Sequence, residues 1–147
     1  MSRFFIRQQI PITAIRLCLL LTACSTISKF DQYAYTQSTS LKVDALSTLR
    51  HATESYPLHQ QEVMKVKTSL DKMFEYEKNR PKNTVTVKMW SVLIDSTGNL
   101  YGGFIKRWQT EGTLDTAFIR ISGDVISQSF DQISQLESGK IRSSQSY

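Results

Sequence analysis

Cysteine is scarce in this chain: two occur in 147 residues, Cys18 and Cys24, and both lie near the N-terminus. Residues 25–147 therefore hold no thiol for a disulfide, a Cys-x-x-Cys redox pair or a cysteine-bound zinc ion. Thiol nucleophiles are excluded from that region for the same reason. A domain there must be held together by buried side chains, and 40% of the sequence is hydrophobic.

Sequence signatures of catalysis are also absent. The chain contains no Gly-x-Ser-x-Gly elbow, His-Glu-x-x-His zinc motif, phosphate-binding Gly-x-x-x-x-Gly-Lys loop or Cys-x-x-Cys-His haem motif. With only two histidines, His51 and His59, no Ser-His-Asp triad can be assigned. These absences favour a non-enzymatic function.

Long apolar runs are absent as well. The longest near the N-terminus is Leu17-Cys18-Leu19-Leu20-Leu21, and Pro11 and Arg16 interrupt the residues before it. A transmembrane helix needs roughly 20 mostly apolar residues. Spanning of the membrane by this segment is therefore disfavoured.

What the N-terminus does have is the layout of an export signal. Residues 1–23 carry three arginines and no acidic residue, then the apolar run, and they end on small residues. The motif Leu21-Thr22-Ala23-Cys24 resembles the lipobox of bacterial lipoproteins. A cytosolic amphipathic leader and an ordinary secretory signal are the alternatives.

The resemblance implies that Cys24 receives a diacylglyceryl group on sulfur, becomes the first residue after cleavage and is acylated on its new amine. Two or more acyl chains hold a protein stably on a bilayer, whereas one gives reversible attachment. In such lipoproteins an Asp after the cysteine favours the inner membrane, and here Ser25 follows. The expected location is the outer membrane, facing the periplasm.

The basic charge of the chain belongs mostly to this leader. The whole sequence has 18 Lys and Arg against 13 Asp and Glu. Without the leader's three arginines, residues 24–147 carry 15 against 13, a net charge of +2. A nucleic-acid partner is therefore not expected.

The rest of the chain predicts a mainly α fold. Residues 24–40 read as the lipidated N-terminus and a polar tether, and residues 41–147 as a single helical periplasmic domain. From 41 to 56 and from 63 to 73, apolar residues recur every three or four positions, and Pro57 separates the two stripes. This pattern predicts a helical hairpin whose second helix ends before Asn79.

The segment 84–108 is ambiguous. Alternating Val85, Val87 and Met89 are typical of a strand, and residues 95–99 offer a turn, so a short β-hairpin is one interpretation. Val87, Trp90 and Ile94 also fit one face of a helix, and two adjacent glycines at 102 and 103 weaken a strand. Short helices are the favoured interpretation.

A long C-terminal helix follows. Asp115 is the expected N-cap, Leu114 and Ile119 occupy the positions of a hydrophobic staple, and Gly139 stands where a helix end favours a left-handed residue. Gly123 interrupts the helix at a cost of about 1 kcal/mol relative to Ala. A close packing contact is the expected reason for that glycine.

Two groups of side chains are candidate sites. His51 and Glu54 precede Pro57 by about as much as His59 and Glu62 follow it, so the hairpin would bring both pairs to its tip. Imidazole and carboxylate ligands suit Zn²⁺ or Cu²⁺, and we hypothesise a metal site there; two solvated His/Glu pairs are the alternative.

The second group lies in residues 101–108. Two adjacent basic residues stand beside aromatic ones there, which is typical of contacts with a partner protein, lipid headgroups or a glycan, although core packing of the aromatics is the alternative. The residues of this candidate partner-binding segment are Tyr101, Phe104, Lys106, Arg107 and Trp108.

The sequence thus predicts a membrane-anchored lipoprotein of the bacterial envelope, acting as a non-enzymatic binding or scaffold protein. Apart from the acyl lipid on Cys24, no cofactor is expected. The tail from residue 102 to residue 140 resembles small uncharacterised envelope lipoproteins, a likeness that implies no activity. A metal-handling or stress-related periplasmic protein using His51 and His59, and an envelope hydrolase, remain as alternatives.

Overall fold

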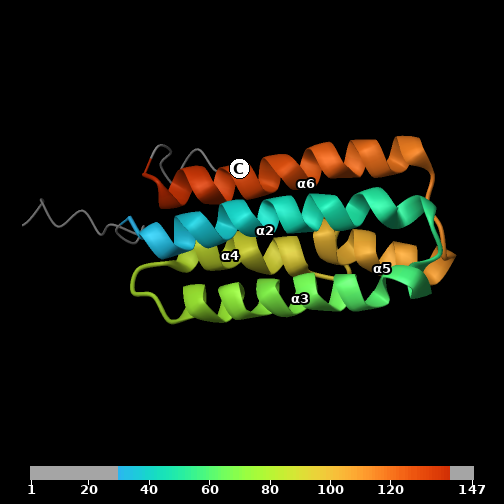
Figure 1. Ribbon diagram of the computed structural model, residues 1–147. Coiled ribbons are helices and arrows are strands. Elements are labelled where there is room, and N and C mark those ends of the chain that lie inside the picture. The colour runs from blue at the N-terminus through green and yellow to red at the C-terminus, as the bar shows by residue number, and fades with distance from the viewer. Residues whose placement is uncertain (1–29, 140–147) are drawn as a thin grey trace, which may run out of the picture.

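Five α-helices and one short 3₁₀ turn lie along a common axis in the computed structural model, which describes residues 30–139 (Figure 1). The expected signal peptide at 1–23, the expected lipidation site Cys24 and residues 25–29 lie outside the described residues, as do residues 140–147. The elements are α2 (Gln32–Arg50), the 3₁₀ turn η1 (His51–Thr53), α3 (Tyr56–Lys78), α4 (Thr84–Ile94), α5 (Tyr101–Glu111) and α6 (Thr116–Glu137).

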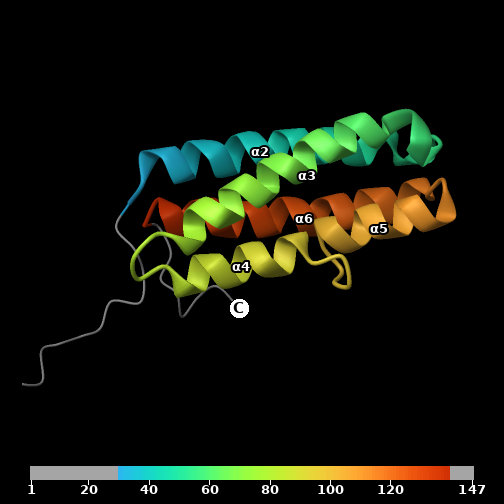
Figure 2. The same ribbon diagram turned by 90° about the horizontal axis from the view of Figure 1, so that it is seen from below.

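The helices form a four-helix bundle in which α4 and α5 together take the place of the third helix. α2 and α3 run antiparallel, α4 and α5 follow each other along one side, and α6 returns beside α2 (Figures 1 and 2). α4 and α5 together span about the length of one long helix, which makes the topology up-down-up-down. The bundle has two ends, which we call the α2–α3 end and the α3–α4 end after the connections found there.

The predicted helical hairpin and the long C-terminal helix are confirmed. α3 ends at Lys78, just before Asn79, and α6 begins after Asp115, whose carboxylate accepts hydrogen bonds from the backbone N–H groups of Ala117 and Phe118 at 2.8 and 3.2 Å. Gly139 adopts a φ of 71°, in the left-handed region that favours glycine. The first helix of the hairpin is shorter than the apolar pattern over 41–56 predicts. It ends at Arg50, and buried Ala52 of that pattern lies in the 3₁₀ turn that follows.

The tether predicted for residues 24–40 is too long. α2 already begins at Gln32, where the Asp31 carboxylate caps it by accepting the N–H of Ala34 at 3.0 Å. Its polar first turns pack because Ser38 is buried and its hydroxyl lies 2.9 Å from that of Ser134 on α6. The helical bundle therefore starts about nine residues earlier than the apolar pattern indicated.

The β-hairpin considered for residues 84–108 is wrong, and the favoured helices are confirmed as α4 and α5. Trp90 and Leu93 are fully buried at helical spacing on α4. The two glycines have a helical role, since a β-carbon at Gly102 or Gly103 would overlap the backbone at Ile94 or Gly98. They allow the first turn of α5 to lie directly against the end of α4.

The core runs the length of the bundle and is rich in aromatic residues. Trp90 packs edge-to-face on Phe130 with 6.0 Å between ring centroids. The largest fully buried apolar side chains are Trp90, Trp108, Tyr101, Phe130, Leu49, Leu70, Leu93, Ile126, Ile133 and Leu136.

The close contact predicted at Gly123 is wrong, because no atom lies within 4 Å of where its β-carbon would stand.

None of the helices within residues 30–139 combines the length and apolar character that crossing a bilayer requires.

Candidate metal site

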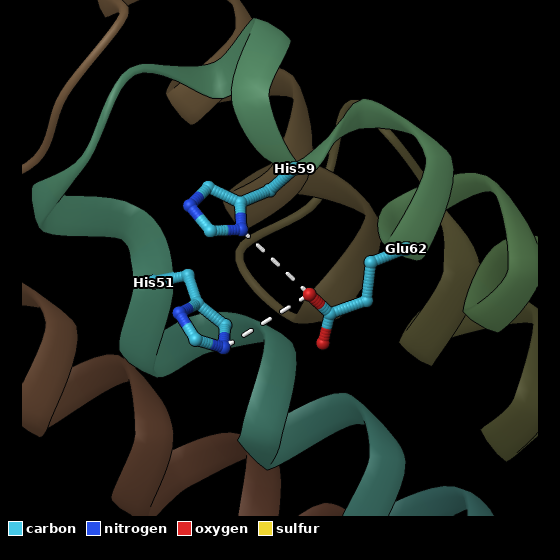
Figure 3. Close-up of side chains that lie close together, drawn as sticks. All are labelled: His51, His59 and Glu62. Atoms are coloured by element: carbon cyan, nitrogen blue, oxygen red, sulfur yellow. Dashed lines mark ion pairs between the residues drawn. The ribbon is translucent and has the colours of Figure 1, made fainter.

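Three potential metal ligands converge where α2 turns into α3. Their ligand atoms, one each from His51, His59 and Glu62, all lie within 4.8 Å of one another. In Figure 3 both imidazoles face the Glu62 carboxylate: His51 Nε2 lies 3.9 Å and His59 Nδ1 3.7 Å from Glu62 Oε2. The predicted convergence of the two histidines at the hairpin tip is thus what the structure shows.

The local sequence explains this convergence. α2 ends at Arg50, so His51 opens the 3₁₀ turn at the end of the helix. Pro57 stands in the first turn of α3, where its missing N–H costs nothing. His59 and Glu62 are three residues apart on α3 and therefore share a helix face. That face looks back across the turn toward His51.

The connection is held in place by backbone hydrogen bonds to the α5–α6 loop. The Tyr56 N–H donates to the carbonyl of Gly112 at 3.0 Å, and the Leu114 N–H donates to the carbonyl of Ala52 at 2.7 Å. Ala52 and Leu114 are buried. The site is consequently built on a fixed turn, with α5 and α6 as its support.

Glu54 does not join the three ligands, which corrects the four-ligand hypothesis. Its Oε2 instead lies 2.9 Å from His59 Nε2, the ring nitrogen that does not face Glu62. Because the two nitrogens of an imidazole point in different directions, Glu54 contacts His59 from the other edge of the ring. It is placed to orient His59 rather than to share an ion with it.

The three potential ligands differ in how far their side chains are exposed to solvent. The side chain of His59 is 15% exposed, whereas those of His51 and Glu62 are 41% and 40% exposed. The two imidazoles stack with 4.5 Å between centroids and 15° between planes, and Trp108 packs beneath His59 at 5.8 Å. One side of the cluster therefore rests on the core and the other faces solvent.

Polar groups under the cluster complete its surroundings. The Thr48 hydroxyl, whose shorter hydrogen bond goes to the Asp44 carbonyl at 3.0 Å, lies 3.4 Å from Glu62 Oε1, and Oε2 is the oxygen that faces the histidines. Burial raises the pKa of the Tyr101 hydroxyl, and the charge of Glu62 adds to that effect. Among the described residues, no lysine or arginine pairs with Glu54 or Glu62.

The aromatic side chains of the candidate partner-binding segment do not lie on the surface of the protein. Tyr101, Phe104 and Trp108 are each at most 2% exposed, so the core-packing alternative is correct for the aromatics. Lys106 and Arg107 are exposed, but Arg107 pairs with Glu111 at 2.8 Å and its guanidinium lies 4.2 Å from the ring centroid of Phe118. These aromatic side chains are buried because they lie on the face of α5 that packs against the other helices.

Sequence reasoning missed a second polar cluster, at the α3–α4 end. Arg80 Nη1 donates to Glu77 Oε2 and to Glu137 Oε2, each at 2.7 Å, and both carboxylates are buried. A signal was present in the sequence: Glu77 lies four residues after buried Met73, and Glu137 four residues after buried Ile133. Each acid therefore continues an apolar face.

This second cluster extends to neighbouring polar side chains. Asn83 donates to the carboxylate and the carbonyl of Glu77, and Thr86 donates to Glu137 Oε1 at 3.1 Å. Arg80 Nε also lies 3.6 Å from Asp31 Oδ2, which accepts a hydrogen bond from Tyr76 at 2.7 Å. Burial, followed by the charge of Glu137, raises the pKa of Glu77.

Comparison with known proteins adds no relative to this geometry. The search found no family model, no curated protein and no solved structure that matches the chain. Functional conclusions therefore rest on the residues and their arrangement.

Proposed function

We propose that this protein is a lipid-anchored, non-enzymatic protein of the bacterial envelope that binds a divalent transition metal ion through His51, His59 and Glu62. The observation that carries the metal-binding function is the convergence of these three ligand atoms within 4.8 Å of one another. The anchoring rests on the lipobox ending at Cys24 and on its resemblance to bacterial lipoproteins.

The donor set selects the class of metal. Two imidazoles and one carboxylate suit Zn²⁺ and Cu²⁺, which bind such ligands at about 2.0–2.2 Å. Tetrahedral geometry at those bond lengths spaces ligand atoms by roughly 3.3 Å. The distances from Glu62 Oε2 to the two histidine nitrogens, 3.7 and 3.9 Å, are only slightly longer. Because each nitrogen lone pair lies in its ring plane and the two planes are only 15° apart, the half-exposed His51 ring must turn out of the stack for both nitrogens to face one ion.

The position of the site suits a protein held at its N-terminus. Cys24 precedes the first residue of α2 by eight positions, and α2 has 19 residues. At 1.5 Å per residue, that helix puts His51 about 28 Å from the start of the bundle. An anchor on Cys24 would therefore be attached at the end of the bundle opposite the metal-binding end.

The hydrolase alternative lacks comparable support. It requires a carboxyl of raised pKa in an accessible cleft. Glu77 has a raised pKa, but its side chain is 0% exposed and bonded to Arg80 and Asn83. This carboxyl is inside the bundle and meets no solvent.

Calorimetric titration of the purified chain with Zn²⁺ or Cu²⁺ tests the metal site. We expect one bound ion per chain in the wild type and loss of that binding in the His51→Ala, His59→Ala double variant. At a free metal concentration of 100 Kd, the ion should raise the free energy of unfolding of the wild type by about 2.7 kcal/mol. Binding curves that coincide for the two proteins would rule out the site.

The matched control is Glu75→Gln at the α3–α4 end, which removes an exposed carboxylate that pairs with Lys78. It should bind metal as the wild type does. Anchoring is tested separately by growing cells with radiolabelled palmitate: label on the wild type and none on Cys24→Ser is expected. An unlabelled wild type would refute the lipid anchor and leave the metal result standing.

A further inference from the structure

Resting on the metal-binding function proposed above, we infer that the site is a three-ligand centre whose metal keeps its fourth coordination position for an exchangeable small donor from solution, with Glu54 acting as the residue that positions His59. The proposal assigns two carboxylates of one turn to different roles. Glu62 is a ligand, and Glu54 orients a ligand.

The contacts of Glu54 exclude it from the fourth position. Its Oε2 lies 2.9 Å from His59 Nε2, while the nitrogen that faces the other two ligands is Nδ1. A hydrogen bond to Glu54 keeps the proton on Nε2 and leaves the Nδ1 lone pair for the ion. Metal-bound histidines almost always donate their second N–H to a carboxylate or carbonyl in this way.

The backbone at Glu54 is itself fixed. The indole N–H of Trp108 donates to the Glu54 carbonyl at 2.9 Å, and Trp108 is fully buried. The same indole packs against the His59 ring at 5.8 Å. One buried side chain thus fixes the Glu54 backbone and packs on the His59 ring. The Glu54 carboxylate, on a side chain that is 56% exposed, is held toward the ring by its contact with His59 Nε2.

The open side of the cluster determines what completes the coordination shell. His51 and Glu62, whose side chains are about two-fifths exposed, border solvent, whereas His59 lies against the core. Structural zinc sites are closed by four protein ligands, while three protein ligands leave a position for water or another donor. A monodentate anion or an imidazole nitrogen fits that position, because either replaces water without needing further protein contacts.

Visible absorption of the cobalt-loaded chain tests the inference, with azide as the probe. Co²⁺ replaces the spectroscopically silent Zn²⁺, and its absorption bands respond to a change of ligand. We expect azide to shift the bands of the wild type in a saturable manner while cobalt stays bound. No shift with cobalt retained would overturn the open position, and no cobalt binding at all would overturn the metal-binding function itself.

The Glu54→Gln variant separates positioning from ligation. If Glu54 positions His59, cobalt affinity should fall about 10- to 100-fold and azide should still shift the spectrum. If Glu54 is the fourth ligand instead, azide will bind the variant and not the wild type, which would overturn the inference. Glu75→Gln, at the other end of the bundle, should match the wild type in both measurements.

Discussion

The two ends of the bundle use the same kind of side chain in opposite ways. At the α2–α3 end, Glu62 faces two histidines across 3.7 and 3.9 Å and is 40% exposed. At the α3–α4 end, Glu77 and Glu137 are buried, and each meets Arg80 at 2.7 Å. The contacts of Glu62 with the histidines are long and partly exposed to solvent, whereas the contacts of Glu77 and Glu137 with Arg80 are short and buried.

The difference shows what distinguishes a structural polar cluster from a candidate binding site. Buried carboxylates need an internal cation, because an unpaired charge in a low-dielectric interior is costly. Arg80 provides that cation at the α3–α4 end. The α2–α3 end has no such partner among the described residues, and its groups can remain without one because water solvates them. It is the end that can accept an ion from outside.

Removing Arg80 should have the largest effect of any test of this comparison. In Arg80→Met, the apolar stem is largely retained while Glu77 and Glu137 lose their cation, and the free energy of unfolding at neutral pH should fall by about 3–5 kcal/mol. Urea unfolding followed by circular dichroism measures this fall.

A nearby lysine gives the matched control. Lys78→Met, two residues away, breaks an exposed pair with Glu75 and should leave stability essentially unchanged. Similar losses in the two variants would mean that the buried network contributes no more than a surface pair, and the contrast between the ends would fail.

A smaller effect is expected in the pH dependence of stability. Because burial raises the pKa of Glu77 above its ordinary 4.5, the folded chain binds a proton there more readily than the unfolded chain. The contribution of Glu77 to stability should therefore increase as the pH falls through the raised pKa toward 4.5, and be complete below it.

Glu77→Gln isolates this contribution. Both proteins contain the same two histidines, so subtracting the stability profile of the variant from that of the wild type removes their titration. The difference should grow in favour of the wild type as the pH is lowered from neutrality toward 4.5. A difference that is flat or of opposite sign would contradict the assignment of a destabilised charge at Glu77.

Local sequence patterns are sufficient to predict the helical fold, several helix boundaries and the meeting of the two histidines at the α2–α3 end. Pro57, Asp115 and Gly139 predicted helix boundaries correctly because each acts through its own backbone or its nearest neighbours. The polar character of residues 32–40 predicts a tether, whereas their burial depends on α6, which lies almost a hundred residues away. A local pattern cannot report such a contact.

The candidate site shows the same limit. The His51/Glu54 pair precedes Pro57 by about as much as the His59/Glu62 pair follows it, and this spacing is enough to place both imidazoles at one turn. Which nitrogen faces which carboxylate depends on Trp108, which comes from α5 and fixes Glu54 through its carbonyl. The sequence therefore predicted four ligands where the structure brings three together.

The smallest expected effect concerns the aspartates that cap a helix at each end. Asp115 at the α2–α3 end accepts only from the first turn of α6, and Asp115→Ala should cost about 1 kcal/mol. Asp31 at the α3–α4 end caps α2 and also accepts the Tyr76 hydroxyl at 2.7 Å, so Asp31→Ala should cost about 2 kcal/mol. The excess should shrink when both changes are measured in a Tyr76→Phe background, which leaves Asp31 only its 3.6 Å contact with Arg80 Nε beyond the cap.

The two hydrogen bonds to Asp31 also set its response to acid. They lower its pKa below the ordinary 3.8, with the Ala34 N–H contributing most and the Tyr76 hydroxyl next. Its stabilising contribution is present above pH 3.8 and is lost only as the pH falls through the lowered pKa. The penalty of Asp31→Ala, measured by urea unfolding, should therefore be constant from neutrality to about pH 5 and shrink below pH 3.8. A penalty that shrank already between neutrality and pH 5 would show that Asp31 is not held in its charged form by this end of the bundle.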